Sequence, residues 1–129
     1  MEENKLAIQS QVSNEEIKNL IYTIREKQVM LDSDVAMLYH YETKRVNEAV
    51  KRNIERFPAE FCFQLTSAEY EVLKTQFATS NIRGGKHKLP YVFTEKGIIM
   101  LSGLLKNSVA IEVSIRIVEA FVEMRKFIS

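Results

Sequence analysis

The segment Asp32–Asn53, DSDVAMLYHYETKRVNEAVKRN, decides the fold because its pattern is typical of two short helices joined by a tight turn. Asp32 is a residue type that caps helices, and apolar or small residues then recur at helical spacing on both sides of His40. These residues are Val35, Ala36, Tyr39, Tyr41, Val46 and Ala49, with Val50 continuing the inner face. We therefore predict one helix from Asp32 and a second from Thr43.

Three residues in this segment predict how the two helices meet. Ala36 is small enough to let the second helix cross close to the first, and the β-branched Val46 fills the gap between them. His40 lies at the turn, where a left-handed backbone is often needed and Gly is preferred. A residue other than Gly costs about 1 kcal/mol in that conformation. The pattern predicts a helix-turn-helix-like unit.

The outer face of the second helix, residues 43–53, carries Thr43, Lys44, Asn47, Glu48 and Lys51. Such helices place their amino-terminal residues on base edges, so we expect Thr43, Lys44 and Asn47 to contact bases. Cations further along suit phosphates, and these are Arg45, Lys51, Arg52 and Arg56. The alternative is an ordinary helical hairpin whose charges are merely solvated.

A second basic element lies in Arg83-Gly84-Gly85-Lys86-His87-Lys88. Residues 43–56 and 83–96 together hold nine Lys or Arg and three Glu, which is 9 − 3 = +6 in a chain whose net charge is +1. An asymmetry of this kind indicates an anionic partner. Arg83, Lys86 and Lys88 are therefore candidate DNA contacts on a wing-like loop, and the alternative is a disordered surface loop.

The remaining chain predicts an α+β fold: a mostly helical single domain with small hairpin and strand elements. We expect a flexible tail over residues 1–12 and one domain over residues 13–129. The expected elements are a short helix after Ser13, a hairpin of Ile21–Ile24 and Val29–Leu31, a strand over Phe61–Leu65, a helix from Thr66 to about Phe77, a mobile loop over Ala78–Leu89, a helix from Thr94 to about Leu105 and a helix over 108–128.

The last helix carries two apolar stripes. One stripe can cover the core of the domain, and the second, formed by Ile111, Ile115, Val118 and Val122, would leave an exposed strip that favours a partner. We hypothesise a homodimer through helix 108–128. The alternative is a helix buried on both sides.

Other chemistries find little support. His40, Cys62 and His87 lack the spacing of metal ligands, and Gly84-Gly85 lacks the pattern of a phosphate-binding P-loop. Cys62 lies between two Phe residues and is expected to be a buried apolar residue. There is no secretory leader pattern and no run of about 20 apolar residues. We expect no catalytic site, metal, cofactor, small-molecule substrate or membrane partner, and a cytoplasmic location.

Many spaced motifs in the chain occur in a familiar order. They are Val29-Met30-Leu31-Asp32, Tyr39, Thr43-Lys44-Arg45-Val46-Asn47, Val50-Lys51-Arg52-Asn53, Arg56-Phe57-Pro58, Phe61, Phe63-Gln64-Leu65, Gly84-Gly85, Leu89-Pro90-Tyr91 and Phe93-Thr94-Glu95-Lys96-Gly97. From about Ile21 to Phe127 the chain resembles the KilA-N superfamily, in its ORF-six N-terminal branch. Members commonly have Gly where this chain has Glu26 and His40.

The resemblance implies a DNA-binding domain of phage, prophage or bacterial proteins, some of them antirepressor-like, that usually precedes a variable second domain. The leading hypothesis is therefore double-stranded DNA binding, with helix 43–53 in the major groove and the 83–88 loop beside it, in a phage or prophage regulatory role. The alternative is a protein-interaction module that docks through the apolar carboxyl-terminal helix.

Overall fold

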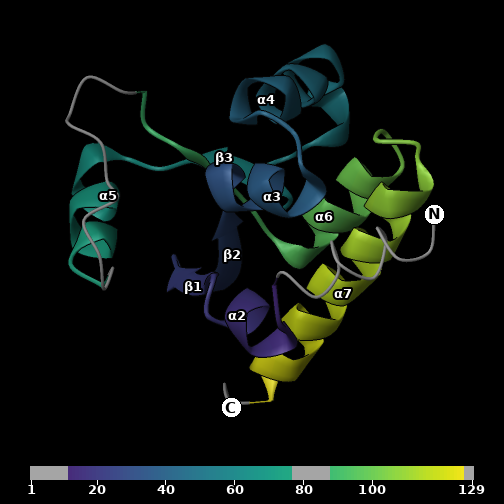
Figure 1. Ribbon diagram of the computed structural model, residues 1–129. Coiled ribbons are helices and arrows are strands. Elements are labelled where there is room, and N and C mark those ends of the chain that lie inside the picture. The colour runs from purple at the N-terminus through teal and green to yellow at the C-terminus, as the bar shows by residue number, and fades with distance from the viewer. Residues whose placement is uncertain (1–11, 77–87, 127–129) are drawn as a thin grey trace.

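The computed structural model describes residues 12–76 and 88–126 and confirms the mixed α+β class (Figure 1). The predictions for residues 1–11, 77–87 and 127–129 lie outside the described residues. In chain order the elements are α2 (Asn14–Lys18), β1 (Ile21–Ile24), β2 (Lys27–Leu31), α3 (Asp32–Tyr39), α4 (Thr43–Arg52), the 3-10 helix η1 (Ile54–Arg56), β3 (Cys62–Gln64), α5 (Ser67–Lys74), β4 (Tyr91–Phe93), α6 (Glu95–Ser102) and α7 (Ser108–Arg125).

The four strands form one antiparallel sheet in the order β1-β2-β4-β3. Because side chains alternate between the two faces of a strand, the register sorts them into rows. Ile21, Met30, Phe93 and Cys62 pair across the sheet in one row, and Leu31, Val92 and Phe63 pair in the other. Each row contributes to a different hydrophobic cluster.

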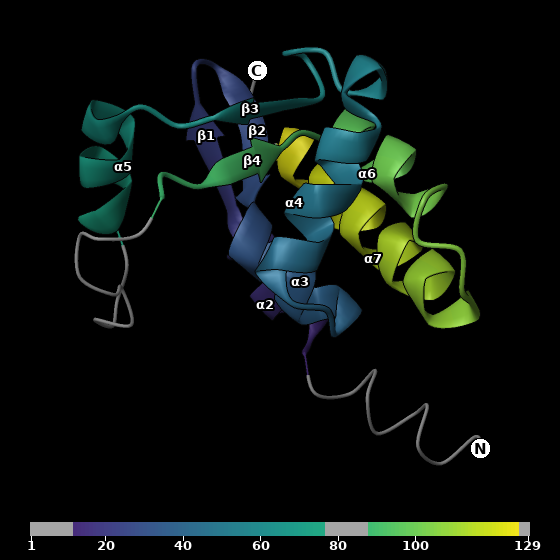
Figure 2. The same ribbon diagram turned by 90° about the horizontal axis from the view of Figure 1, so that it is seen from above.

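The helices are divided unequally between the two faces of the sheet. The face with Met30 and Phe93 forms the main core with residues from α2, α3, α4, α6 and α7. The opposite face packs against Leu73 and Tyr70 of α5 alone. Figures 1 and 2 both show α5 standing apart, while the other helices gather on the far side of the sheet around α7. The proposed two-helix unit therefore sits on the main core.

Local capping signals place most helix starts. Ser13 and Thr66 form the expected capping boxes, and the side chain of Thr94 accepts a hydrogen bond from the backbone N–H of Gly97. Gly97 has a packing role as well, because a Cβ there would lie 2.0 Å from the backbone oxygen of Phe61. A glycine at this position therefore lets α6 lie directly against the chain that enters β3.

Three helices end earlier than predicted, and one of them is α7, which ends at Arg125 instead of about residue 128. Helix α5 ends at Lys74, whereas the prediction ran to about Phe77, and α6 ends at Ser102 instead of about Leu105. The apolar period continues beyond α6 because Leu105 remains buried, although Leu104 and Leu105 both bond back to the carbonyl of Leu101 in a turn. Apolar periodicity therefore extended the α6 prediction beyond the helix end.

The hairpin between β1 and β2 is confirmed, and its turn consists of Arg25 and Glu26 alone. Both residues have positive φ, at 56° and 63°, which is the backbone of a type I′ turn. Gly and Asn are preferred in this conformation because other side chains are strained. The side chain of Arg25 offsets this strain: it forms an ion pair with Glu69 at 2.7 Å and stacks over the ring of Phe63. The turn is thereby fastened to α5.

Candidate nucleic-acid interface

Helices α3 and α4 form the predicted two-helix unit, and His40 makes the turn between them. His40 has φ 63° and ψ 39°, the left-handed conformation expected at this position. The backbone N–H of Tyr41 bonds to the carbonyl of Ala36 at 2.9 Å, and that of His40 bonds to the carbonyl of Met37 at 3.1 Å. These two bonds are those of a Schellman helix end. They redirect the chain from buried α3 to the surface helix α4.

Helix α4 buries one narrow stripe and exposes the rest. Val46 and Val50 are buried in the main core, and Ala49 is half-buried. With 3.6 residues per turn, this stripe leaves the opposite side of the helix in solvent. The exposed residues are Lys44, Arg45, Glu48, Lys51 and Arg52, and Arg56 on η1 extends the same basic segment.

Asp32 anchors the inner side of α4 through a polar contact. Its Oδ2 accepts a hydrogen bond from Nδ2 of Asn47 at 3.0 Å and another from the backbone N–H of Tyr91 at 3.1 Å. Asp32 is only 4% exposed, and this burial raises the pKa of its carboxyl although the hydrogen bonds oppose the shift. One carboxylate thus joins α3, α4 and β4.

This contact corrects one expectation and redirects another. Asp32 is the first residue of α3, not its N-cap: the cap position is Leu31, and the Asp32 carboxylate is used by Asn47 and Tyr91 instead. Asn47, an expected base contact, is half-buried, and its amide nitrogen is occupied by Asp32. Its Oδ1 is buried and has no hydrogen-bond partner in the described part of the chain. The Asn47 side chain therefore points toward the interior of the unit.

The cations of α4 and η1 lie close together in the chain and have no acidic partner among the described residues. Across residues 12–76 and 88–126, no ion pair within 4.0 Å involves Lys44, Lys51, Arg52 or Arg56. The ion pairs of the described residues lie elsewhere: Lys18 with Glu15 and Glu123, Arg25 with Glu69, Lys74 with Glu71, Arg125 with Glu95, and Lys126 with Glu123. Outside α4 and η1, the scattered Lys27, Lys88, Lys96 and Lys106 also make no ion pair with a described residue. The positive charge on α4 is available to an external anion.

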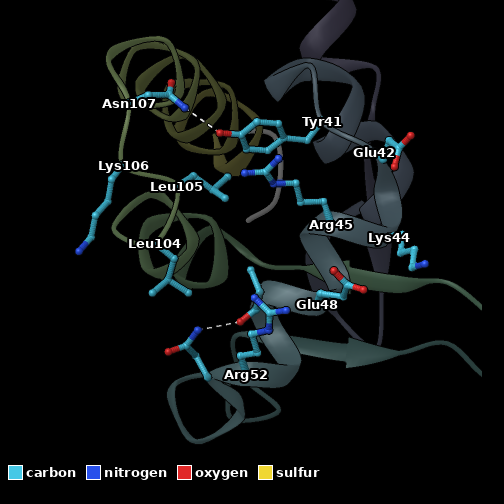
Figure 3. A pocket seen from close by; sticks show the side chains of 12 residues that line it. Tyr41, Glu42, Lys44, Arg45, Glu48, Arg52, Leu104, Leu105, Lys106 and Asn107 are labelled. Atoms are coloured by element: carbon cyan, nitrogen blue, oxygen red, sulfur yellow. Dashed lines mark hydrogen bonds between the residues drawn. The ribbon is translucent and has the colours of Figure 1, made fainter.

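A polar cleft of about 950 Å³ borders α4 on the side of the α6–α7 connection (Figure 3). Arg45 enters this cleft and stacks over the ring of Tyr41, 4.9 Å from its centroid, and the Tyr41 hydroxyl accepts a hydrogen bond from Asn107 at 2.7 Å. Lys106 lies across the cleft and is exposed. Lys44 and Arg52 line the same cleft, which therefore gathers cations from α4 and from the α6–α7 connection.

Of the two predicted basic elements, the described residues include the whole of residues 43–56 but only Lys88 of the second element. Thr43 is half-buried at the start of α4, and the five predicted cations of residues 44–56 are exposed. Arg83 and Lys86 lie outside the described residues. Lys88 is exposed, and the segment 88–90 that leads into β4 lies toward α5, away from α4, in both ribbon views (Figures 1 and 2).

Sequence reasoning missed Lys106 as a member of this surface. Lys106 is isolated in the sequence from the basic cluster of residues 43–56, so local charge density gave no signal for it. Only the packing of α6 beside α4 brings it to the cleft.

The other chemically reactive groups do not form a second site. Burial raises the pKa of the Cys62 thiol to about 12, so the reactive thiolate is suppressed at neutral pH. Among the described residues, no group of three or more His, Cys, Asp or Glu side chains converges as metal ligands. Likewise, none of the helices in the described ranges has the length and apolarity needed to cross a bilayer.

Fold and surface together define a mixed α+β domain in which two helices joined by a left-handed turn expose a cluster of cations. A comparison with protein-family models matches residues 19–104 to the ORF6N domain, which is more than half of the chain. The chain belongs to the ORF6N domain family, a non-catalytic family related to KilA-N and found in phage antirepressor-like proteins. Searches of curated proteins and of solved structures gave no match.

Proposed function

We propose that this domain binds double-stranded DNA through α4, as part of a phage or prophage regulatory protein of antirepressor type. The observation that carries the proposal is the clustering of Lys44, Lys51, Arg52 and Arg56 on α4 and η1, where none of the four makes an ion pair with a described residue. Unpaired like charges repel one another and gain nothing for folding, so their arrangement is explained by an anionic ligand. The family membership of the chain supports the same conclusion.

In this proposal α4 lies in the major groove, which is wide enough to admit a helix. The first turn, with Thr43 and Lys44, approaches base edges, and Lys51, Arg52 and Arg56 contact phosphates. Arg45 contacts a phosphate from the cleft side. Asn47 takes a positioning role through Asp32 instead of reading a base. The basic loop with Arg83, Lys86 and Lys88 is a second phosphate contact, in the manner of a wing.

The test is salt-dependent binding of the full chain to a mixed-sequence duplex, beside a Lys44→Glu/Lys51→Glu variant. Because each phosphate contact adds nearly one to the slope of log K against log salt, the native chain should weaken steeply as salt rises. We expect the variant to bind at least about 100-fold more weakly at low salt, since two attractive contacts become repulsive.

The matched control is Lys74→Glu/Lys126→Glu, which makes the same charge change at two paired positions on α5 and the end of α7. The control should keep most of the affinity, and circular dichroism should show both variants folded. Equal losses in the two variants would mean that net charge alone governs binding. Absence of binding by the native chain at low salt would contradict the proposal.

A second candidate function is self-association, and one observation favours it. On α7, Ile111 and Ile115 are 55% and 53% exposed, and Val122 is exposed as well. With the half-buried Val118 their spacing is four, three and four residues, which is that of a coiled-coil seam. The stripe adjoins Ile99 along an apolar groove of about 270 Å³ between α6 and α7.

We propose that a second copy of the chain covers this stripe, which would present two α4 helices to paired half-sites. Light scattering over a range of concentrations should give the mass of a dimer. An Ile111→Ser/Ile115→Ser variant should be monomeric and bind a single half-site. A monomeric mass for the native chain at high concentration would contradict the dimer, and the exposed stripe would then favour docking of a different protein.

A further inference from the structure

Glu48 occupies the middle of the exposed face of α4. Val46 and Val50 define the buried stripe, and at 100° per residue Glu48 points directly away from it. It lies one helical turn after Lys44 and one turn before Arg52, and Figure 3 shows it between these two side chains. An acid therefore lies at the centre of the exposed face of the helix that the proposed function places in the major groove.

The Glu48 carboxylate is free as well as central. Spacings of four residues to Lys44 and to Arg52 are those at which ion pairs form on helices. No ion pair or hydrogen bond of the Glu48 side chain occurs with any described residue. It makes neither a helix ion pair nor a core contact, so no short-range contact in the described residues accounts for its position.

A carboxylate at this place opposes non-specific binding, because it repels the phosphate backbone that the neighbouring cations attract. A surface built only to hold DNA of any sequence would have a neutral or basic side chain here. A carboxylate contributes favourably to binding where it accepts a hydrogen bond. In the major groove the donors are the exocyclic amines of bases.

We propose that Glu48 is a specificity-determining residue, whose carboxylate accepts a hydrogen bond from the N4 amine of a cytosine in the major groove. The inference rests on the proposed function. Guanine presents only acceptors in that groove and thymine an acceptor beside a methyl group, so both repel or exclude the carboxylate. Adenine offers an amine beside the N7 acceptor, so its interaction with the carboxylate is intermediate between those of cytosine and guanine. Glu48 thereby penalises wrong sequences while the cations supply affinity.

The experiment begins with selection of a preferred duplex from a randomised library by the native full-length chain. Dissociation constants are then measured for that duplex and for duplexes in which each base pair is exchanged in turn. The variants are Glu48→Ala and Glu48→Gln, and the control is Glu55→Ala, which removes an exposed acid from η1 in the same basic segment. Circular dichroism confirms that each variant is folded.

We expect Glu55→Ala to bind all duplexes somewhat more tightly, because it removes one repulsive charge. Glu48→Ala should bind the exchanged duplexes more tightly for the same reason but gain nothing on the preferred duplex, where its hydrogen bond to cytosine is lost. Only Glu48→Ala should lose discrimination, by about tenfold, at a single C·G pair. Glu48→Gln should move the preference at that pair toward adenine, which Gln contacts through two hydrogen bonds. A purely structural role for Glu48 would produce no such change of base.

Two results would overturn the inference and leave the proposed function standing. One is a native chain that binds every duplex equally; the other is a Glu48→Ala variant that keeps the native ratio of affinities. Failure of the native chain to bind any duplex would instead overturn the proposed function, and the inference with it.

Discussion

Helices α4 and α7 are held to the domain in opposite ways. Helix α7 buries six residues along its length and packs against α2, α3 and α6. At its carboxyl end, Arg125 pairs with Glu95, and Lys126 pairs with Glu123 at 3.2 Å. Helix α4 buries only Val46 and Val50 and adds one polar anchor through Asn47, and its outer cations remain unpaired.

The difference shows that the charges near α7 contribute to the stability of the fold, whereas the cations of α4 do not. Surface ion pairs contribute at most about 1 kcal/mol each, so the pairs near α7 are small gains in stability. The clustered cations of α4 give no such gain and repel one another. Glu48 and Glu55 lie in the same segment but form no ion pair with these cations, and this cluster of unpaired cations is the physical basis for assigning α4 to an anionic ligand.

The largest expected effect concerns two carboxylates, Asp34 on α3 and Glu123 on α7. Burial, together with the nearby Asp32, raises the pKa of Asp34 on α3 to about 6, whereas Lys126 and Lys18 lower that of Glu123 on α7. Asp34 binds its proton more tightly in the folded state, so stability should fall as pH rises from about 4 to about 6. The Asp34→Asn variant should be more stable at pH 7 by up to about 3 kcal/mol.

Glu123 should change the pH dependence of stability in the opposite direction. Its contribution is present above its ordinary pKa and is lost as pH falls below it, so Glu123→Gln should lose stability at pH 7 and little at pH 3. Urea unfolding of both variants at a series of pH values would check the two slopes. Parallel slopes for the two variants would contradict the assigned environments.

The next effect tests the anchor of α4. In Asp32→Ala the amide of Asn47 and the N–H of Tyr91 lose their acceptor, and we expect a loss of about 2 kcal/mol in the free energy of unfolding. In Asp32→Asn the side-chain oxygen can still accept both bonds, so most of the stability should remain. DNA affinity should follow the same order. An alanine variant as stable as the native chain would show that Val46 and Val50 hold α4 by themselves.

A smaller effect compares the cations of the two helices directly. Arg52→Ala/Arg56→Ala should weaken DNA binding by about tenfold and lower the salt slope by about two, because two phosphate contacts are lost. Arg125→Ala/Lys126→Ala removes two cations that are already paired and should leave both quantities nearly unchanged. Fluorescence anisotropy with a labelled duplex would measure both. Equal losses would remove the distinction between the two surfaces.

The smallest effect lies at the turn that starts α4. Because His40 is left-handed, His40→Gly should relieve strain and stabilise the domain by about 1 kcal/mol, reduced by the greater freedom of glycine in the unfolded chain. Affinity for DNA should not change, since the orientation of α4 is retained. Thermal unfolding provides the measurement, and a lower melting temperature would point to a contact of the imidazole in place of backbone strain.

Local signals predicted much of this fold. The capping boxes at Ser13 and Thr66, the β1–β2 hairpin, the two helices around His40 and the basic outer face of α4 depend on neighbouring residues, and all are present. The strand β4 was not predicted, because three residues after a proline carry almost no periodicity and gain their strand character from pairing with β2 and β3.

The inward role of Asn47 depends on contacts that are distant in sequence. Asp32 lies 15 residues away and Tyr91 lies 44 residues further along, and both positions converge only in the folded domain. A helical pattern places Asn47 near the edge of the apolar stripe but does not reveal a buried carboxylate facing it. The sequence therefore did not predict the hydrogen bonds of Asp32 with Asn47 and Tyr91, but it did predict the exposed charges of α4.

The most direct test of the central claim is an NMR titration of the full chain with a mixed-sequence duplex at low salt. The contrast between α4 and α7 predicts that backbone amide shifts concentrate in residues 43–56 and fade as salt is added. The exposed residues of α7 should remain largely unchanged in the same series. Shifts concentrated on α6 and α7, with residues 43–56 unaffected, would contradict the assignment of α4 as the DNA-binding surface.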